Sequence, residues 1–316
     1  MNEHRLSRRN LLSAGTLATC GVLAGQGNVP AADKRRRRFR YCFNTSTIRG
    51  QELSLEQEID VTAKAGYDGI EPWVSKLHKY VQNGGSLRDI RKRIEDRGLV
   101  VESAIAFGSW IVDDDERRAK GFEQVKRDMD VLAQIGGTRI AAPPAGANRT
   151  PGLDLLKAAE RYRQLLELGE QTGVVPQLEI WGPSANLHRL GEAMFVLVES
   201  GHPKACLLPD VYHIYKGGSD HTGLKCISAQ AMHVFHMNDY PADPPRETIG
   251  DRDRVMPGDG IAPTNEILRN LRNNDCYPAL SLELFSPAYW RKDPQEVAEL
   301  GLEKMKNAVG KALATA

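Results

Sequence analysis

Short apolar runs alternate with longer amphipathic segments along most of this chain, and this alternation constrains the fold more strongly than any other feature. Eight runs are expected to form strands, at 41–45, 69–72, 100–106, 138–142, 175–181, 205–210, 232–237 and 279–284. Segments with helical periodicity follow them, at 54–65, 87–97, 116–135, 153–172, 187–200, 222–229, 265–273 and 294–313. Strands that alternate with helices pair in parallel, and eight such units predict an α/β fold, a single closed (β/α)8 barrel of the TIM type.

Glycine marks several of the expected helix-to-strand joints. Gly66, Gly98, Gly136 and Gly173 each follow a helical segment, where a helix commonly ends on a residue with left-handed backbone. This repetition favours one repeated architecture. A Gly-x-Gly-x-x-Gly motif does not follow the first expected strand, which argues against a dinucleotide-binding fold.

The first thirty residues differ in character from the rest of the chain. Arg8 and Arg9 precede a Gly- and Ala-rich apolar stretch at 11–24, a pattern typical of a twin-arginine export signal. We therefore expect a signal peptide at 1–32 and a mature protein that is periplasmic or otherwise exported. The apolar stretch is too short to hold a membrane-spanning helix. A lipoprotein signal processed at Cys20 and an ordinary flexible basic terminus are the alternatives.

The remaining chain is expected to form one domain. Basic residues crowd the segment 33–39, which predicts a disordered arm, and 40–316 is expected to form the barrel. At 316 residues with 41% hydrophobic content, the chain is long enough to bury a large core. The formal net charge of +1 does not indicate a nucleic-acid-binding protein.

Four cysteines follow the expected signal, and none has the CxxC spacing of a zinc or redox site. Cys42, Cys206 and Cys276 lie in or beside expected strands, where a small buried thiol is the usual role. Cys226 lies in an expected helix. Twin-arginine export moves folded proteins, so disulfides are not required for the exported chain.

Residues with metal-binding side chains stand at the ends of the last four expected strands. Glu179, Asp210, His236 and Glu283 are separated by 31, 26 and 47 residues, lengths that suit successive strand-helix units. In a barrel these strand ends meet at the C-terminal face, where active sites lie. Acidic residues also end strands because strand ends meet water, but four on consecutive strands favour a metal site. Three carboxylates and one imidazole suit Mn²⁺ or Mg²⁺ and are compatible with Co²⁺ or Zn²⁺.

Five short motifs lie in the C-terminal half of the chain: Leu178-Glu179, Asp210 with His213, His236-Met237-Asn238-Asp239, Arg254 with Pro257-Gly258-Asp259-Gly260, and Leu282-Glu283. They resemble the motifs of the xylose isomerase-like barrel superfamily, in particular its sugar isomerase and epimerase group. The resemblance extends from about Arg40 to the last expected helix. It implies that the four strand-end residues bind one divalent metal.

The resemblance also implies roles for residues around the metal. It assigns contacts with substrate oxygens to His213 and Arg254. Glu71, which ends the second expected strand, resembles an acidic residue that binds a sugar hydroxyl, with a structural salt bridge as the alternative. Trp181 and Trp290 are candidates for stacking on the apolar face of a sugar, with simple packing as the alternative.

Proton abstraction next to a carbonyl requires such a set of groups. A cation that chelates adjacent carbonyl and hydroxyl oxygens stabilises the negative charge of the enediolate, while a carboxylate removes the proton. Glu179 and Glu283 come from well-separated strands, so they can flank a substrate, one removing a proton and the other returning one. We expect both to be catalytic, in an isomerase or epimerase of a sugar, cyclitol or related polyhydroxy carbonyl compound.

Part of the family pattern is missing from the chain. Ketose 3-epimerases usually carry a further substrate-binding Glu shortly after the position of Glu179, but 181–186 contains no acid. The end of the fourth expected strand, at 141–144, also lacks His and acidic residues. The substrate of those epimerases therefore cannot be transferred to this chain.

Other functions on the same scaffold stay open. A lyase, such as an inosose or dehydroshikimate dehydratase, begins with the same proton abstraction and then expels a β-hydroxyl. A non-catalytic carbohydrate-binding protein would keep the metal for structure only. A DNA repair endonuclease would need additional His and Glu ligands, which the early strands do not supply. We expect a small carbohydrate as partner, with no nucleic acid and no membrane span; the sugar, the metal and whether the chain forms a homo-oligomer are left open.

Overall fold

The computed structural model describes residues 38–314, and residues outside this range are not described. The predicted signal peptide at 1–32 and most of the predicted arm at 33–39 therefore lie outside the described residues. Phe39 belongs to the predicted arm, yet its side chain is buried and its ring lies 5.2 Å from that of Tyr277. The packed barrel thus begins slightly earlier than the sequence predicts.

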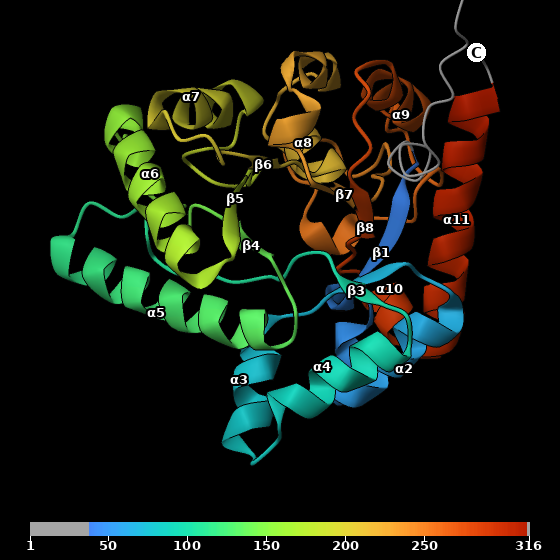
Figure 1. Cartoon of the computed structure of the whole chain (residues 1–316). Coiled ribbons are helices and arrows are strands. Elements are labelled where there is room, and N and C mark those ends of the chain that lie inside the picture. The colour runs from blue at the N-terminus through green and yellow to red at the C-terminus, as the bar shows by residue number, and fades with distance from the viewer. Residues whose placement is uncertain (1–37, 315–316) are drawn as a thin grey trace, which may run out of the picture.

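Eight strands form the centre of the molecule (Figure 1). They are β1 (Arg40–Asn44), β2 (Gly69–Glu71), β3 (Val100–Val101), β4 (Arg139–Ala142), β5 (Val175–Glu179), β6 (Leu207–Leu208), β7 (Val234–Met237) and β8 (Ala279–Leu282). All pairings between them are parallel. The strands form one sheet in the order β3-β2-β1-β8-β7 and a second in the order β4-β5-β6.

Isolated backbone contacts join these two sheets into a barrel. Between β6 and β7, Asp210 forms a parallel bridge with His236. On the other side, the backbone N–H of Ala141 in β4 donates to the carbonyl of Ala104, beyond the end of β3, at 2.9 Å. The strands therefore close in chain order from β1 to β8, and the predicted barrel is confirmed.

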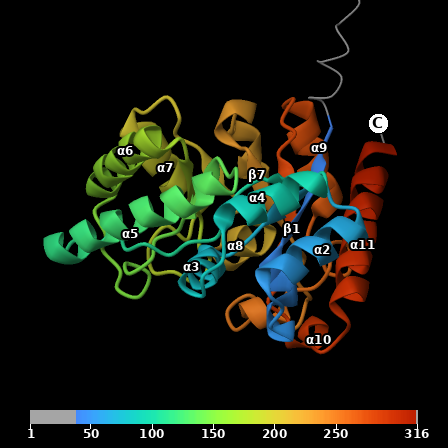
Figure 2. The same ribbon diagram turned by 60° about the horizontal axis from the view of Figure 1, so that its bottom comes forward.

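Helices surround the barrel (Figures 1 and 2). They are α2 (Leu55–Ala65), α3 (Val74–Gln82), α4 (Leu87–Asp96), α5 (Asp115–Gln134), α6 (Leu155–Thr172), α7 (Leu190–Ser200), α8 (Val211–Lys216), α9 (Thr264–Asn273), α10 (Pro287–Trp290) and α11 (Pro294–Ala314). Short 3-10 turns are η1 (Thr45–Gln51), η2 (His221–Cys226), η3 (Ala229–Ala231) and η4 (Asp251–Asp253). Seven of the eight predicted helices lie within a few residues of their predicted bounds.

The helix predicted at 222–229 is wrong. The segment forms η2 and η3 instead, and Ile227 between them has extended backbone, with φ −101° and ψ 125°. A short segment that contains Gly223 has too little intrinsic helical preference to form a helix alone. By contrast, α8 was not predicted, and its cap is Asp210, whose carboxylate accepts a hydrogen bond from the backbone N–H of His213 at 2.7 Å.

The predicted glycine joints are confirmed. Gly66, Gly98, Gly136 and Gly173 have φ angles of 90°, 71°, 88° and 76°. At these angles a side chain would crowd the following carbonyl, and glycine avoids that cost. A glycine with positive φ therefore lets the chain turn toward the next strand after each of α2, α4, α5 and α6.

The interior of the barrel changes from apolar to polar toward the candidate site. A small buried cluster that includes Cys42, Ile105 and Leu208 fills part of the interior. Gln177, two residues before Glu179 and so on the same face of β5, donates from its side chain to Ser103 at 3.1 Å. Polar groups therefore begin one layer below the strand ends.

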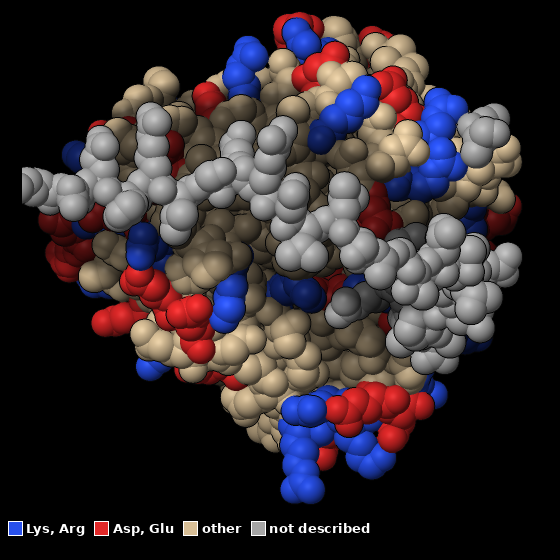
Figure 3. Space-filling model, turned by 45° about the horizontal axis from the view of Figure 1, so that its top comes forward, with Lys and Arg blue, Asp and Glu red and all other residues tan. Residues whose placement is uncertain are grey.

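The cysteines and the surface agree with the expectations from composition. Cys42, Cys206 and Cys276 are buried and free, as predicted, and Cys226 is exposed and free. Lys and Arg are interspersed with Asp and Glu on the face shown in Figure 3. Among the described helices, none combines the length and the apolar character needed to cross a membrane.

Candidate active site

The structure brings the four predicted metal ligands together at the C-terminal ends of the strands. Glu179 ends β5, His236 lies in β7, Glu283 directly follows β8, and Asp210 caps α8. The Nδ1 atom of His236 lies 3.3 Å from Glu283 Oε2, 3.8 Å from Asp210 Oδ2 and 3.9 Å from Glu179 Oε1. All four side chains are buried. One imidazole nitrogen therefore faces three carboxylates.

This donor set fits a divalent cation. Ligand atoms of Asp210, His236 and Glu283 lie within 4.8 Å of one another, the spacing expected around one small ion. His236 Nδ1 and Glu179 Oε2 are buried polar atoms without a hydrogen-bond partner in the described structure. Buried polar atoms normally form hydrogen bonds, so these two atoms are available to bind a cation. Oxygen-rich sets of this kind suit Mn²⁺ or Mg²⁺.

Glu71 lies behind His236 and away from the pocket. Its Oε2 is 3.1 Å from His236 Nε2 and also accepts hydrogen bonds from Ser281 Oγ at 2.6 Å and Asn44 Nδ2 at 3.0 Å. The Glu71 side chain is completely buried. The expected contact with a sugar hydroxyl is therefore not the arrangement seen, because the carboxylate is already engaged. Its contact with Nε2 orients the imidazole so that Nδ1 faces the carboxylates.

Arg254 links the metal ligands to the other predicted substrate-binding residue. Its Nη1 donates to Asp210 Oδ2 and to Glu283 Oε2, both at 2.9 Å. Its Nη2 lies 3.1 Å from His213 Nε2 and 2.5 Å from Asp251 Oδ1. Since a guanidinium can only donate, His213 Nε2 accepts and its hydrogen is on Nδ1. That Nδ1 is buried without a partner, so it can donate to a substrate oxygen.

The pKa values of Glu179 and Glu283 are shifted in opposite directions. Burial raises the pKa of Glu179 to about 8, and the attraction of His236 offsets only part of this effect. Burial also acts to raise the pKa of Glu283, but the attraction of the nearby His236 and the charge of Arg254 outweigh it, so the pKa is lowered. Neighbouring carboxyl groups whose pKa values are shifted apart are typical of acid and base partners.

The pKa values of His236 and His213 are also shifted in opposite directions. Burial acts to lower the pKa of His236, but the charges of Glu283 and Glu71 outweigh it and raise the pKa well above its usual value. Burial lowers the pKa of His213, which agrees with a neutral ring that accepts from Arg254. A cation can use the His236 ring only after Nδ1 loses its proton, so cation binding and proton release are coupled.

A cavity of about 350 Å³ lies above these residues, and Glu179, Glu283, His213 and Arg254 all line it. Trp181 also lines the cavity, as the stacking prediction requires. Its remaining walls come from loops that follow the strands, in accord with the location of active sites in such barrels.

Trp290 lies elsewhere. Its indole N–H donates to the carbonyl of Ser46 at 3.0 Å, and its ring occupies the space beside Gly50. It is not one of the residues that line the cavity. The packing alternative therefore describes Trp290, which holds α10 against η1.

Three aromatic residues of the cavity were missed by sequence reasoning: Trp73, Phe107 and Phe285. A sequence signal exists for two of them. Glu71-Pro72-Trp73, Glu179-Ile180-Trp181 and Glu283-Leu284-Phe285 repeat the pattern Glu-x-aromatic at the ends of three strands. Residues two apart on an extended strand share one face, so Trp181 and Phe285 extend the cavity wall that begins with Glu179 and Glu283.

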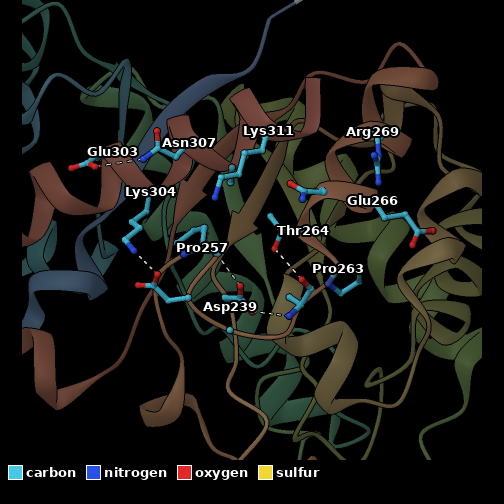
Figure 4. A pocket seen from close by; sticks show the side chains of 16 residues that line it. Asp239, Pro257, Pro263, Thr264, Glu266, Arg269, Glu303, Lys304, Asn307 and Lys311 are labelled. Carbon is cyan, nitrogen blue, oxygen red and sulfur yellow. Dashed lines mark hydrogen bonds and ion pairs between the residues drawn. The ribbon is translucent and has the colours of Figure 1, made fainter. Parts of the chain in front are cut away.

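A second cavity of about 520 Å³ lies between α9, α11 and the loop at 257–263 (Figure 4). The buried carboxylate of Asp239 holds this loop, accepting hydrogen bonds from the backbone N–H groups of Gly258 and Ala262, both at 2.9 Å. The backbone of Asp239 also pairs with that of Val255, at 2.9 and 3.0 Å. Asp239 therefore supports the segment that carries Arg254.

The chain is similar in sequence to several characterised enzymes. Inosose isomerase of Bacillus velezensis is 25% identical over 284 residues, which cover 86% of this chain and 98% of that protein. The 3-dehydro-D-guloside 4-epimerase of Escherichia coli is 26% identical over 227 residues, 66% of this chain and 78% of that protein. The 3-dehydroshikimate dehydratase of Pseudomonas aeruginosa is 24% identical over 239 residues, 75% of this chain and 37% of that protein.

Solved structures show the same fold. The crystal structure of the IOLI protein with a bound zinc atom has a TM-score of 0.79 at 22% identity and covers 87% of this chain and 99% of that one. The relatives named above include isomerases and epimerases of sugar-like compounds, so an enzyme of this kind is supported. A family model described as xylose isomerase-like TIM barrel matches residues 59–308. The chain therefore belongs to the xylose isomerase-like TIM barrel family.

Proposed function

We propose that the chain is a divalent-metal-dependent isomerase or epimerase of a sugar, cyclitol or related polyhydroxy carbonyl compound. The observation that carries this proposal is the pair Glu179 and Glu283, which line one cavity and share His236 Nδ1 at 3.9 and 3.3 Å. Similarity to inosose isomerase and to the guloside epimerase supports the same reaction class.

The positions of the two glutamates suit a two-base reaction, because they stand at the ends of separate strands, β5 and β8, and line the same cavity. One carboxylate removes the proton from the carbon next to the substrate carbonyl, and the electron pair of that C–H bond moves toward the carbonyl oxygen. The other glutamate, in its acid form, returns a proton from the opposite side. A bound cation would supply positive charge where the substrate oxygens become negative.

Neighbouring residues hold this arrangement in place. Arg254 bonds to both Asp210 and Glu283, so it fixes the position of one base relative to a metal ligand. His213 Nδ1–H can donate to a substrate oxygen, because Arg254 holds the opposite nitrogen. Aromatic rings line the same cavity, which limits the access of water to the reacting carbons.

Mn²⁺ or Mg²⁺ is the cation we propose, with Co²⁺ or Zn²⁺ compatible with the same residues. Three carboxylates and one imidazole, Glu179, Asp210, Glu283 and His236, support this choice. We also propose that the chain is exported through its twin-arginine motif, on the strength of Arg8 and Arg9 before an apolar stretch.

The test is deuterium wash-in. Metal-loaded full-length protein is incubated in D₂O with ketoses, inososes and keto-glycosides, and NMR follows deuterium at the carbon next to the carbonyl. Glu179→Gln and Glu283→Gln are expected to lower the exchange rate by at least about 100-fold, whereas exposed Glu199→Gln is expected to match the wild type. Exchange at the wild-type rate in both active-site variants would refute the two-base mechanism.

A lyase is the second candidate, because similarity to a 3-dehydroshikimate dehydratase favours it. Both reactions begin with removal of the same type of proton. Loss of a β-hydroxyl would produce a conjugated carbonyl with new ultraviolet absorbance and would consume the substrate. An epimerase or isomerase would instead reach an equilibrium mixture from either side.

A further inference from the structure

The first strand of the barrel ends between two buried glutamates. Asn44 is the last residue of β1, and β1 pairs in parallel with β2 on one side and with β8 on the other. Asn44 lies opposite Glu71 in β2. On the other side Phe43 lies opposite Leu282, so the same register places Asn44 beside Glu283. Asn44 is completely buried and stands between one candidate base and the glutamate behind the imidazole.

The amide of Asn44 bonds to both glutamates. Its Nδ2 donates to Glu71 Oε2 at 3.0 Å and to Glu283 Oε1 at 3.1 Å. Its Oδ1 accepts a hydrogen bond from the backbone N–H of Ser46 at 3.0 Å. Because a backbone N–H can only donate, the amide oxygen faces Ser46 and both Nδ2 hydrogens face the carboxylates. One neutral side chain therefore supplies a donor to each of two buried carboxylates, which offsets part of the cost of burying them.

Thr47 holds the backbone on both sides of Glu283. It lies in η1, shortly after Asn44, and is completely buried. Its Oγ1 donates to the carbonyl of Leu282 at 3.0 Å and accepts from the backbone N–H of Leu284 at 3.1 Å. Leu282 and Leu284 are the residues immediately before and after Glu283. Thr47 therefore holds the backbone around Glu283, while Asn44 holds its carboxylate.

The two candidate bases are held to different degrees. Both carboxylate oxygens of Glu283 accept hydrogen bonds, Oε1 from Asn44 at 3.1 Å and Oε2 from Arg254 at 2.9 Å. Glu179 Oε2, by contrast, is buried without a hydrogen-bond partner in the described structure. Neither Asn44 nor Thr47 lines the active-site cavity, so neither is placed to contact a substrate. An effect of these two residues on the reaction must therefore pass through the residues that they hold.

We propose that Asn44 and Thr47 are positioning residues that fix Glu283 both as a cation ligand and as a base. The part that concerns the base rests on the function proposed above. A carboxylate removes a proton efficiently only within hydrogen-bond reach of it, and a displacement of about 1 Å lowers the rate about 100-fold. Residues that orient metal ligands change cation affinity about 10- to 100-fold. Loss of either positioning residue should therefore change kcat and the Kd for the cation, and leave KM unchanged.

The kinetic test uses variants that keep the shape of the side chain. Asn44→Asp keeps the acceptor for the N–H of Ser46 but loses both donors, and Thr47→Val loses only the hydroxyl. In deuterium wash-in at saturating Mn²⁺, kcat of the full-length protein is expected to fall about 30-fold in Asn44→Asp and about fivefold in Thr47→Val, with KM within about twofold. Ser46→Ala is the matched control and is expected to keep the wild-type kcat, because Ser46 Oγ is buried nearby without a hydrogen-bond partner in the described structure.

Calorimetric titration of chelator-treated protein with MnCl₂ provides a test that needs no substrate. Thr47→Val is expected to raise the Kd about fivefold in otherwise wild-type protein, but less than about twofold in a Glu283→Ala background, because its effect passes through Glu283. Asn44→Ala is expected to raise the Kd about tenfold, and still about fivefold in a Glu71→Gln background, where its contact with Glu71 is already altered.

The two measurements separate the inference from the proposed function. Wild-type kcat in both Asn44→Asp and Thr47→Val would overturn the inference while the proposed function stands. An equal rise in Kd for Thr47→Val with and without the Glu283 side chain would also overturn it, because that result indicates a general loss of packing. Absence of exchange with every keto sugar would overturn the proposed function. The Mn²⁺ titrations would then decide the role of Asn44 and Thr47, and wild-type Kd in both variants would refute it.

Discussion

Replacement of Glu71 by Gln is expected to weaken metal binding although Glu71 is not a ligand. Glu71 lies 3.1 and 3.3 Å from His236 Nε2, and the charges of the pair favour the hydrogen bond. Gln has nearly the same shape and its amide oxygen still accepts a hydrogen bond, but it has no charge, so it holds the imidazole with Nδ1 toward the carboxylates less firmly.

The magnitude follows from the lost interaction. A hydrogen bond to a charged group contributes about 1.5–3 kcal/mol, and each 1.4 kcal/mol changes an equilibrium constant tenfold. The Kd for the cation should therefore rise about 10- to 100-fold, in line with the usual effect of residues that support metal ligands. Isothermal titration calorimetry of chelator-treated protein with MnCl₂ at pH 7.5 measures this change.

Glu102→Gln is the matched control for this experiment. Glu102 is also a buried glutamate paired with a base, since Arg40 donates to it at 2.6 and 2.9 Å, but that pair does not contact the candidate metal ligands. It should lower the thermal stability and leave the Kd for Mn²⁺ within about twofold. Equal Mn²⁺ affinity of Glu71→Gln and the wild type would refute the role assigned to Glu71.

Three further predictions concern other parts of the chain. Burial raises the pKa of Glu58 to about 7, although the charge of Lys76 acts to lower it. The folded state therefore binds this proton more tightly than the unfolded state. The free energy of unfolding should fall between pH 4.5 and 7 by up to about 3 kcal/mol. Glu58→Gln should flatten that fall in thermal melts, and an unchanged pH profile would contradict the assignment. Asp239→Asn should destabilise the fold by about 2 kcal/mol in urea titrations, because the charged acceptor of the loop is lost; an unaltered midpoint would argue against it. Changing Arg8 and Arg9 to Lys should retain the protein in the cytoplasm in cell fractionation, and continued export would exclude the twin-arginine route.

The barrel could be predicted because its signals are local. Apolar runs, helical periodicity and the glycines at 66, 98, 136 and 173 each depend on a few neighbouring residues. The helix that was predicted at 222–229 failed because its local signal was weak. α8 was missed because its cap, Asp210, was assigned only to the end of a strand, whereas its carboxylate also starts a helix.

The candidate site could be predicted in part. Convergence of the four strand-end residues follows from the barrel, since parallel strands end at one rim. The position of Glu71 behind His236 could not be predicted, because it depends on which ring nitrogen faces a residue 165 positions away. Trp290 was misplaced because an aromatic residue near a strand end packs equally well against its own neighbours, here η1.

The central claim is that one cation is held by Glu179, Asp210, His236 and Glu283. Pulsed electron paramagnetic resonance of the Mn²⁺-loaded protein tests it most directly, because it detects nitrogen atoms bonded to the ion. We predict one Mn²⁺ per chain with coupling to a single imidazole nitrogen, and loss of that coupling in His236→Gln. A nitrogen coupling that persists in His236→Gln, or Mn²⁺ with no nitrogen ligand in the wild type, would contradict the account.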